Sequence, residues 1–263
     1  MQKLMLGVSI FVLLLIFIYM ALPFFMTRIC GIGVFRKGKH AAQVAFTFDD
    51  GPDPRYTPQL LDLLQEHGIK ATFFVLGCKA EKYPELMRRI YREGHQIGIH
   101  NYTHLPNWLM TPRQVRRQHV DRSADIVERI TGERPAFYRP PWGILNAGDF
   151  LFLRKSYRLV LWSVMGWDWK RDTDADRLKR RLIKKIKPGS VVLLHDSGDT
   201  IGADEAAPQQ MLEGLQDVLK ELRLKGYQCV RADELQALRC AGYDKGVDRG
   251  RVPINVALPR IYK

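Results

Sequence analysis

Short apolar runs alternate with amphipathic helical segments along most of this chain, and this alternation restricts its fold more than any other feature. Strands that are apolar along their whole length are typical of a parallel sheet covered by helices on both faces. We therefore expect an α/β fold, and one domain with this many strands suits a (β/α) barrel better than an open sheet. The expected strands are residues 43–48, 71–77, 96–100, 136–139, 158–164, 190–195 and 227–231, and the expected helices are residues 57–67, 83–93, 111–130, 175–186 and 209–225.

Near the N-terminus, residues 4–26 contain no charged side chain. A helix of this length crosses a hydrocarbon core of about 30 Å. The short apolar region and small-residue cleavage site of a secretory signal peptide are not evident, so we expect an uncleaved anchor that contacts membrane lipid. The chain then divides into the anchor at residues 1–26, a basic juxtamembrane linker at 27–40, the main domain at 41–240 and a basic tail of unassigned role at 241–263.

The formal net charge of +13 implies an anionic neighbourhood. Nucleic acid, lipid headgroups and an acidic wall polymer all fit this charge, and so does a generally basic surface. Of the four cysteines, none lies in a C-x-x-C pair, which argues against a thiolate zinc site. Cys229 and Cys240 could form a disulfide in a domain outside the cell, whereas unpaired and partly buried thiols are the default expectation.

Two motifs carry side chains that suit a metal site. Asp49 and Asp50 follow an apolar run, and their side chains should diverge on an extended backbone and find different partners. A solvated turn is the alternative for these two residues taken alone. His100 and His104 would lie on one face of a helical turn, and with Asp50 they supply two nitrogens and one oxygen. Three protein ligands with one open position are typical of catalytic zinc sites.

Three further segments place polar side chains near expected strand ends, where barrels form their active sites. Arg139 opens the run Arg-Pro-Pro-Trp-Gly, Asp168 lies between two tryptophans, and His195 ends the run Val-Val-Leu-Leu. Taken singly, Arg139 could be a surface arginine and His195 a satisfied core histidine. Their common position at strand ends makes them candidates for one site.

These motifs occur in a characteristic order: T-F-D-D-G-P, H-x-x-x-H, R-P-P-W-G, D-W and L-L-H-D. In this order and at these separations, the chain resembles the polysaccharide deacetylases, the NodB-homology group or carbohydrate esterase family 4. The resemblance covers residues 44–235 and implies a distorted (β/α) barrel with about seven parallel strands. It also implies a bound divalent metal, usually zinc, although these ligand types do not separate zinc from cobalt, manganese or nickel.

The resemblance also implies a role for each motif. Carried over by position, the metal ligands are Asp50, His100 and His104. Asp49 is the general base, and His195 is the general acid that protonates the departing sugar nitrogen.

Supporting roles follow from the same resemblance. Arg139 should pair with Asp49 and keep it ionised and oriented. Asp168 should face His195 and raise its pKa. The backbone N–H of Trp142 should stabilise the oxyanion.

The sequence departs from the family pattern in two places. Trp142 stands where the family usually has tyrosine, and Met165 occupies the position of an earlier aspartate in the fourth motif. We interpret both as changes in substrate contacts. Trp108, Trp142 and Trp169 could stack on sugar rings, although core packing accounts equally well for Trp169.

The expected function is hydrolysis of the acetamide of N-acetylated amino sugars in a cell-wall or related polysaccharide, peptidoglycan or chitin-like. One alternative is a deacetylase or deformylase of a lipid-linked amino sugar. Another is a degenerate module that binds the polymer without cleaving it. A glycosidase gains nothing from a metal site, and nucleic-acid binding would rest on charge alone, so neither is expected.

Two arguments disagree about the orientation of the chain in the cell membrane. Basic residues after the span outnumber those before it, and the positive-inside rule then places the main domain in the cytoplasm. The family mostly works outside the membrane, where its polymers are. We follow the family and expect a single-pass protein with an extracytoplasmic catalytic domain.

Overall fold

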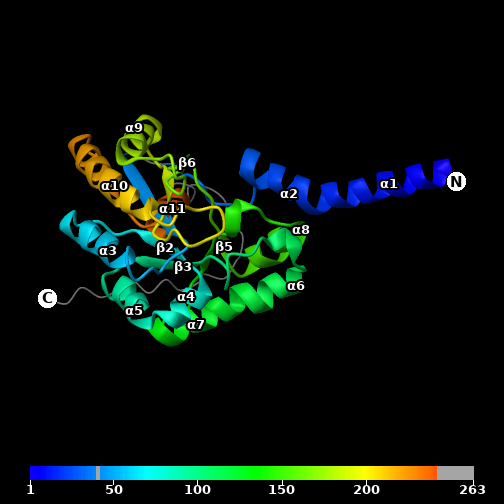
Figure 1. Cartoon of the computed structure of the whole chain (residues 1–263), viewed down its shortest axis with the longest axis horizontal. Coiled ribbons are helices and arrows are strands. Elements are labelled where there is room, and N and C mark those ends of the chain that lie inside the picture. Colours follow the sequence, from blue (N-terminus) through cyan, green and yellow to red (C-terminus); the bar gives the residue numbers. More distant parts are fainter. Residues whose placement is uncertain (40–41, 242–263) are drawn as a thin grey trace.

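The computed structural model describes residues 1–39 and 42–241. Strand β1 (Gln43–Asp49) lies at the centre of a parallel sheet, between β2 (Thr72–Val75) and β7 (Val191–His195). The strand order is β5-β4-β3-β2-β1-β7-β6, and helices surround it (Figure 1). The other strands of this order are β3 (Gln96–Ile99), β4 (Phe137–Tyr138), β5 (Arg158–Leu159) and β6 (Val164–Met165).

The last strand, β8 (Gln228–Cys229), pairs with the first two residues of β1. Together these strands confirm the predicted α/β fold with a distorted barrel of parallel strands. Six of the seven residues of β1 are buried, and so are the first four residues of β7. Side chains on both faces of these strands are therefore buried, which is why the strands are apolar along their whole length.

One expected strand is wrong. Residues 158–164 were expected to form a single strand, but they form β5, which pairs with β4, and β6, which pairs with β7. Between them, the carbonyls of Val160 and Leu161 each accept a hydrogen bond from the guanidinium of Arg139 at 3.4 Å. In the described sheet β5 and β6 are the two ends of the strand order and do not pair with each other, so the barrel stays open at this point.

The expected helices are all present. They are α3 (Thr57–Glu66), α5 (Pro84–Arg92), α7 (Arg122–Thr131), α9 (Ala175–Lys185) and α10 (Ala207–Leu224). The long helix expected at residues 111–130 begins with α6 (Pro112–Gln114) and passes through a π-helical stretch, Val115–Asp121, into α7. Thr111 and Gln114 cap its start in a reciprocal capping box.

Three helices escaped sequence analysis. These are α4 (Gly77–Lys82), α8 (Ala147–Phe152) and α11 (Ala232–Ala241). The first two have only six residues each, which is too short for a helical hydrophobic period to stand out. Cys229 is a free thiol, so the disulfide alternative is not formed. The side chain of Cys240 and the tail at 242–263 lie outside the described residues.

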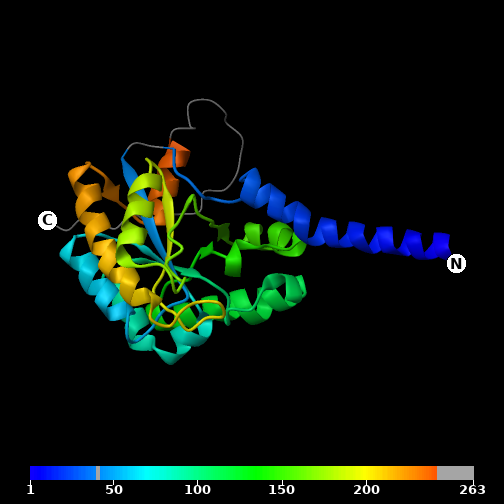
Figure 2. The same ribbon diagram turned by 45° about the horizontal axis from the view of Figure 1, so that its top comes forward.

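A long apolar helix projects from the domain at the N-terminus (Figures 1 and 2). It runs over Gln2–Ile29, 28 residues, and is long and apolar enough to cross a membrane. It comprises α1 (Gln2–Ile16), a π-helical turn at Phe17–Ala21, α2 (Leu22–Phe24) and a second π-helical turn at Phe25–Ile29. Pro23 has no N–H to continue the hydrogen-bond ladder, which accounts for the local π geometry.

The stretch expected as a linker is only partly separate from the domain. The helix continues into it as far as Ile29, and Val34 and Phe35 are buried in the hydrophobic core. The amide of Phe35 donates to Leu159, and the amide of Leu161 donates to Phe35. This segment therefore covers the place where the chain passes from β5 to β6.

Candidate active site

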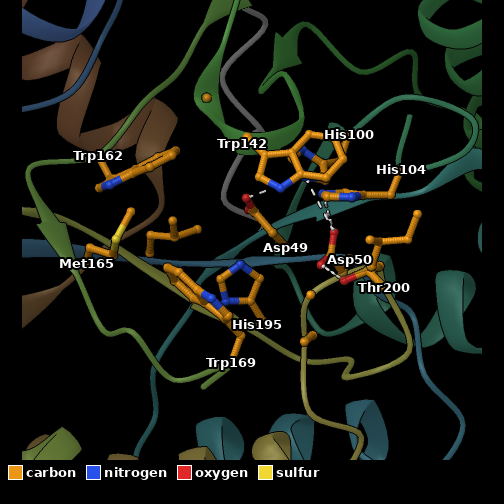
Figure 3. Close-up of a pocket in the computed structure, with 15 residues that line it drawn as sticks. Asp49, Asp50, His100, His104, Trp142, Trp162, Met165, Trp169, His195 and Thr200 are labelled. Carbon is orange, nitrogen blue, oxygen red and sulfur yellow. Dashed lines mark hydrogen bonds and ion pairs between the residues drawn. The ribbon is translucent and has the colours of Figure 1, made fainter. Parts of the chain in front are cut away.

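The candidate site lies at the carboxyl ends of the central strands. Asp49 ends β1 and is in register with His195, which ends the neighbouring β7. His100 follows the end of β3, and Arg139 follows the end of β4. Parallel strands bring these carboxyl ends to the same edge of the sheet, so residues far apart in sequence surround one cavity (Figure 3).

The two adjacent aspartates point to different partners, as predicted. Asp49 Oδ1 accepts a hydrogen bond from Nη1 of Arg139 at 2.6 Å. Asp50 has a left-handed backbone, with φ of 74°, which turns its side chain toward the histidine loop. Its Oδ2 accepts from the hydroxyl of Thr200 at 2.8 Å.

His100 and His104 do not lie on a helical turn, which corrects the sequence-based expectation. They belong to the loop after β3, where Asn101 adopts a φ of 69° and redirects the chain. The start of α4 fixes this loop, because the amides of Gly77 and Cys78 donate to the carbonyls of residues 101 and 102 at 2.9 Å. The loop still brings the two imidazole rings together, with centroids 5.3 Å apart.

The three expected ligands fit a divalent metal ion. Nε2 of His100 and Nε2 of His104 each lie 3.5 Å from Oδ1 of Asp50. That oxygen is buried and has no hydrogen-bond partner among the described residues. One donor atom from each residue lies within 4.8 Å of the others. A buried carboxylate oxygen left unpaired between two imidazole nitrogens is explained by a cation that all three would bind.

The protonation states also suit ligation. Nδ1 of His100 lies 2.7 Å from the carbonyl of Arg139, so Nδ1 carries the proton and Nε2 has a free lone pair. Burial lowers the pKa of His100 to about 3, despite the opposing charge of Asp50. Burial also lowers the pKa of His104. Both rings are therefore neutral near pH 7, as metal binding requires.

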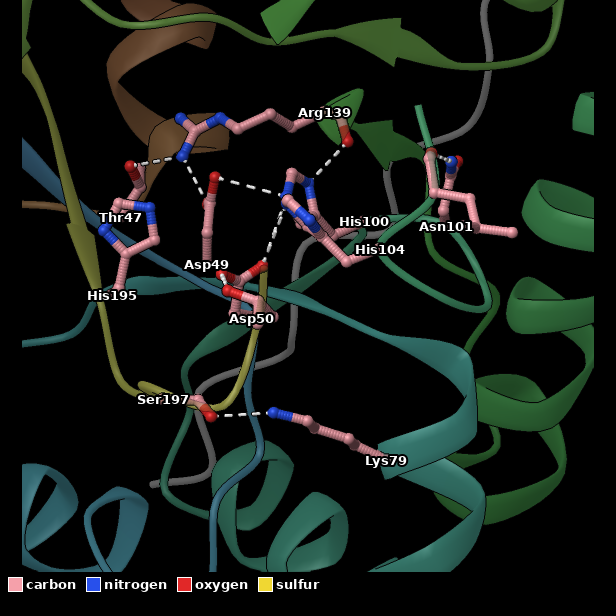
Figure 4. A network of polar contacts seen from close by, with 12 residues as sticks. Thr47, Asp49, Asp50, Lys79, His100, Asn101, His104, Arg139, His195 and Ser197 are labelled. Atoms are coloured by element: carbon pink, nitrogen blue, oxygen red, sulfur yellow. Dashed lines mark hydrogen bonds and ion pairs between the residues drawn. The ribbon is translucent and has the colours of Figure 1, made fainter. Parts of the chain in front are cut away.

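Arg139 connects the two halves of the site (Figure 4). Its backbone carbonyl orients His100, and its fully buried guanidinium donates to Asp49 and, at 2.8 Å, to the hydroxyl of Thr47. The guanidinium also lies over the ring of Phe74, 4.1 Å from the centroid. Burial raises the pKa of Asp49, and the charge and hydrogen bond of Arg139 oppose that rise. Arg139 thus holds the candidate base in place and favours its ionised form.

His195 and Asp168 form the second expected pair. Nδ1 of His195 lies 3.2 Å from Oδ1 of Asp168, and the backbone N–H of His195 donates to Oδ2 at 2.6 Å. Burial alone would lower the pKa of His195, but the charge and hydrogen bond of Asp168, with smaller contributions from Asp50 and Asp49, raise it to about 9. His195 is therefore protonated near pH 7, as a general acid must be.

Comparison with known proteins identifies the family of this chain. The family model for polysaccharide deacetylase matches residues 36–154. A chitooligosaccharide deacetylase of Sinorhizobium fredii is 34% identical over 197 residues, which are 73% of this chain and 91% of that protein. The chain belongs to the polysaccharide deacetylase family. This confirms the resemblance that the five motifs indicated.

Other polysaccharide deacetylases are also similar to this chain. A peptidoglycan-N-acetylglucosamine deacetylase of Bacillus cereus is 38% identical over 180 residues, 66% of this chain and 65% of that protein, just under two thirds of its length. Among solved structures, a peptidoglycan N-acetylglucosamine deacetylase in complex with 4-naphthalen-1-yl-N-oxidanyl-benzamide has a TM-score of 0.71 at 32% identity. That match covers 81% of this chain and 96% of the other.

Aromatic side chains line the cavity of this polysaccharide deacetylase. The ring centroid of Trp142 is 4.2 Å from that of His104, and Trp169 packs edge-on against His195 at 5.0 Å. Trp142 is 41% exposed, which leaves one side of its ring open to a ligand. Trp108 is not among the described residues that line the cavity, so the structure does not bring it to the other candidates.

Strained backbone conformations cluster in this part of the polysaccharide deacetylase fold. Besides Asp50 and Asn101, Trp142 has a φ of 55° and Trp167 a φ of 60°. Non-glycine residues adopt left-handed conformations at a cost, and such residues gather at functional sites. At Trp142 this geometry, followed by Gly143 at φ 68°, turns the backbone at the cavity wall.

Sequence analysis missed two parts of the cavity. Trp162 lines it from the β5–β6 connection, and Thr200 with the residues up to Ala203 lines it from the loop after β7. The buried end of Lys79 fixes that loop, because its ammonium donates to Ser197 at 2.7 Å and pairs with Asp199. The only sequence signal was that these polar residues follow closely after His195.

Proposed function

We propose that this chain is a metal-dependent N-deacetylase that hydrolyses the acetamide of N-acetylated amino sugars in a cell-wall polysaccharide. One observation carries the proposal. A paired carboxylate, Asp49, and a protonated histidine, His195, end neighbouring strands on one cavity beside a three-residue metal site. A base, an acid and a cation site in one cavity are the parts that amide hydrolysis needs.

The metal would be held by Asp50, His100 and His104, and zinc suits two nitrogens and one oxygen. Cobalt, manganese and nickel bind similar ligands. When bound, a divalent metal supplies Lewis-acid polarisation of the amide carbonyl and lowers the pKa of a water molecule. The cavity leaves one side of the three ligands open to that water and to substrate.

Asp49 acts as the general base. Its carboxylate takes a proton from the attacking water as the new C–O bond forms at the acetyl carbon. The ion pair with Arg139 at 2.6 Å opposes the rise in the pKa of Asp49 that burial causes, and so favours the ionised carboxylate. The hydroxyl of Thr47 accepts from the same guanidinium. The backbone N–H of Trp142 donates to the carbonyl oxygen as negative charge develops there.

His195 acts as the general acid. Its Nδ1 is held by Asp168, so Nε2 delivers the proton to the amide nitrogen as the C–N bond breaks. The products are acetate and the free amine of the sugar. A module that only binds polymer has no need of an ionised base and a protonated acid together, so this pairing favours an enzyme over the non-catalytic alternative.

The substrate class is proposed from the relatives. Their names specify peptidoglycan-N-acetylglucosamine, peptidoglycan-N-acetylmuramic acid and chitooligosaccharide deacetylases. In this chain, Trp142 and Trp169 would contact the sugar rings. The proposal of a polysaccharide substrate therefore rests on similarity to the family together with an open cavity lined by aromatic side chains.

One observation favours the alternative of a lipid-linked amino sugar. The guanidinium of Arg28, at the end of the N-terminal helix, lies 4.1 Å from the ring centroid of Trp162, which lines the cavity. The cavity wall is thus in contact with the helix. Deacetylation of a soluble N-acetylglucosamine oligomer, compared with a lipid-linked amino sugar, separates the two functions.

We also propose that Gln2–Ile29 is an uncleaved single-pass anchor and that the catalytic domain lies outside the cytoplasmic membrane. Support comes from the length and apolar character of the helix and from the wall polymers named for the relatives. A reporter fused after the domain tests the orientation, since a cytoplasmic reporter signal contradicts a wall-polymer substrate.

The decisive experiment uses the full chain purified in detergent and supplied with zinc. We expect acetate release from an N-acetylglucosamine oligomer that a chelator abolishes and that Asp49→Asn nearly abolishes. The matched control is Asp62→Asn, an exposed carboxylate paired with Arg89, which should leave the rate unchanged. Full activity of Asp49→Asn with metal still bound would show that another group is the base.

A further inference from the structure

Four large apolar side chains are exposed on one end of the domain. Trp108 and Leu109 are 38% and 67% exposed, and Leu151 and Phe152 are 49% and 50% exposed. We call these four residues the apolar end face. They come from the loop after the histidines and from α8, two segments that are far apart in the sequence. Exposed apolar residues gathered on one face mark an interaction surface.

A buried polar network holds the two halves of the apolar end face together. The amide of Asn107 donates to Asp149 Oδ2 at 2.7 Å, and the amide of Asn146 donates to the carbonyl of Asn107 at 3.1 Å. Gly148 also approaches Pro112 so closely that a Cβ at this glycine would lie 2.1 Å from the proline ring. Asn107 and Asp149 are buried, so the face is a fixed part of the fold.

The N-terminal helix docks beside this face. The hydroxyl of Tyr19 donates to the carbonyl of Met110 at 3.1 Å, next in sequence to Leu109. Two helical segments, Phe17–Ala21 and Leu22–Phe24, pack against α8, which carries Leu151 and Phe152. In both views of the molecule, α8 and α6 lie at the end from which α1 projects (Figures 1 and 2).

The length of the projecting helix bears on where this end of the domain would lie if the helix crosses a membrane. Residues 1–18 are all exposed, and Tyr19 is the first to contact the domain. Between Lys3 and Tyr19 the apolar helix spans fifteen residues, or about 22 Å at 1.5 Å per residue. A hydrocarbon core is about 30 Å thick. A complete crossing therefore draws Tyr19 and the residues after it into the membrane, together with the domain surface packed on them.

The charges around the face match a lipid surface. Residues 105–117 and 150–155 carry five basic side chains and no acidic one. All five are exposed. Three of them line a groove with Phe152, where Arg116 also pairs with Asp121 at 3.4 Å. The five are Arg113, Arg116, Arg117, Arg154 and Lys155. Apolar side chains bordered by basic ones suit the boundary between acyl chains and anionic headgroups, and tryptophan is enriched there.

We propose that the apolar end face is a membrane-docking surface that inserts at the headgroup level of a bilayer containing anionic lipid. Trp108 then serves as an interfacial anchor, which explains its position outside the catalytic cavity. The proposal rests on the proposed membrane anchor. It adds that the domain is seated on the bilayer through its own surface and does not hang from the anchor alone.

The test measures the depth of single probes on the full chain reconstituted in lipid vesicles. An environment-sensitive fluorophore is attached to Leu109→Cys or Phe152→Cys. Each variant is made in a protein whose native cysteines are replaced by serine, and circular dichroism checks that this protein still folds. Leu224→Cys, at an 88% exposed site on α10, is the matched control, and Val12→Cys reports on the anchor. Quenching is measured with nitroxide-labelled lipids.

We expect strong quenching and a blue shift at positions 109, 152 and 12, and little change at 224. Quenching at 12 but not at 109 or 152 overturns the docking surface and leaves the anchor intact. No quenching at position 12 overturns the anchor itself. Protection at 109 that depends on protein concentration and not on the lipid quencher indicates a second copy of the chain, which also overturns the proposal.

A second arm tests the charges. Adding phosphatidylglycerol to phosphatidylcholine vesicles should deepen the probes at 109 and 152, and replacing Arg113, Arg116 and Arg117 by glutamine should remove that gain. The matched control replaces three exposed basic residues of α9, Arg180, Lys184 and Lys185, by glutamine. Equal loss in both triple variants contradicts a specific basic border.

Discussion

Asp168 holds His195 in two ways, through the backbone N–H at 2.6 Å and through Nδ1 at 3.2 Å. The first contact fixes where the end of β7 lies, and the second fixes how the imidazole is turned. The same carboxylate is the main cause that raises the pKa of His195 against the effect of burial. Geometry and protonation of the candidate acid therefore depend on one residue.

The first prediction concerns this pair. Asp168→Asn removes the charge that keeps His195 protonated, so its pKa falls from about 9 toward or below its ordinary value of 6.5. The protonated fraction at neutral pH then drops, and the alkaline limb of kcat/KM moves to lower pH. We expect a loss of about 100-fold or more, within the range for general acid catalysis. An unchanged alkaline limb, measured as acetate release against pH, contradicts the assignment of His195.

The second prediction concerns Arg139. Arg139→Met leaves Asp49 as a buried carboxylate without its cation, which should cost about 3–5 kcal/mol in the free energy of unfolding. Arg139→Lys keeps a charge but loses the planar group that reaches Asp49 and Thr47 together, so kcat should fall with a smaller loss of stability. Urea unfolding and acetate release are the measurements.

The matched control for Arg139 is Arg134→Gln, which breaks a surface pair with Asp125 and Glu128. Exposed pairs contribute about 0–1 kcal/mol, so this change should be nearly neutral. If Arg139→Met unfolds at the same urea concentration as Arg134→Gln, the buried ion pair does not stabilise the site.

The third prediction concerns metal removal. A chelator should abolish acetate release and lower the unfolding temperature, because a metal ion that binds only the folded state stabilises that state by mass action. His104→Ala should weaken zinc binding, measured by calorimetric titration, because it removes one of three ligands. His67→Ala, at the partly exposed end of α3, should bind zinc as the parent does. Equal zinc affinity in the two variants contradicts the ligand set.

The fourth prediction is a pH dependence of stability. Burial raises the pKa of Asp149 from 3.8 to about 7. Between these values the folded protein keeps a proton that the unfolded chain releases, so this group favours folding at low pH and its contribution falls as the pH rises through that window. Asp149→Asn removes the titration, so its stability relative to the parent should improve from about pH 4.5 to about pH 8, by about 1.4 kcal/mol for each pKa unit.

Denaturant unfolding at the two pH values gives the difference for Asp149→Asn. Asp125→Asn, at an exposed carboxylate, is the matched control for the substitution itself. A relative stability of Asp149→Asn that stays constant between the two pH values rules out a raised pKa at this position.

Much of the candidate site was predictable because it lies at strand ends. Asp49 and His195 end long apolar strands, and the parallel register that brings them together follows from the fold class. The histidine pair shows the limit of this reasoning. Its spacing suggested a helical turn, but the left-handed Asn101 and hydrogen bonds from α4 build a loop instead. Tertiary contacts of this kind leave no periodic trace in the sequence.

Two other differences have physical causes of the same sort. The apolar run at residues 158–164 was expected to form one strand. Between β5 and β6, however, the carbonyls of Val160 and Leu161 accept from the buried guanidinium of Arg139, and the amide of Leu161 donates to Phe35. Trp108 was expected to contact sugar rings because it is aromatic. Its exposure on the outer surface depends on how Asn107 is tied to α8, which only the three-dimensional structure shows.

The docked N-terminal helix has a mechanical consequence. Arg36 donates to the carbonyls of Arg28 and Ile29 at the helix end, and Arg28 stacks on Trp162 at the cavity wall. A helix held in this way is a rigid support for the domain and not a flexible tether. If this helix is the proposed membrane anchor, the catalytic cavity is held at one height and tilt above the bilayer, and only polymer strands that pass through that thin layer come within its reach.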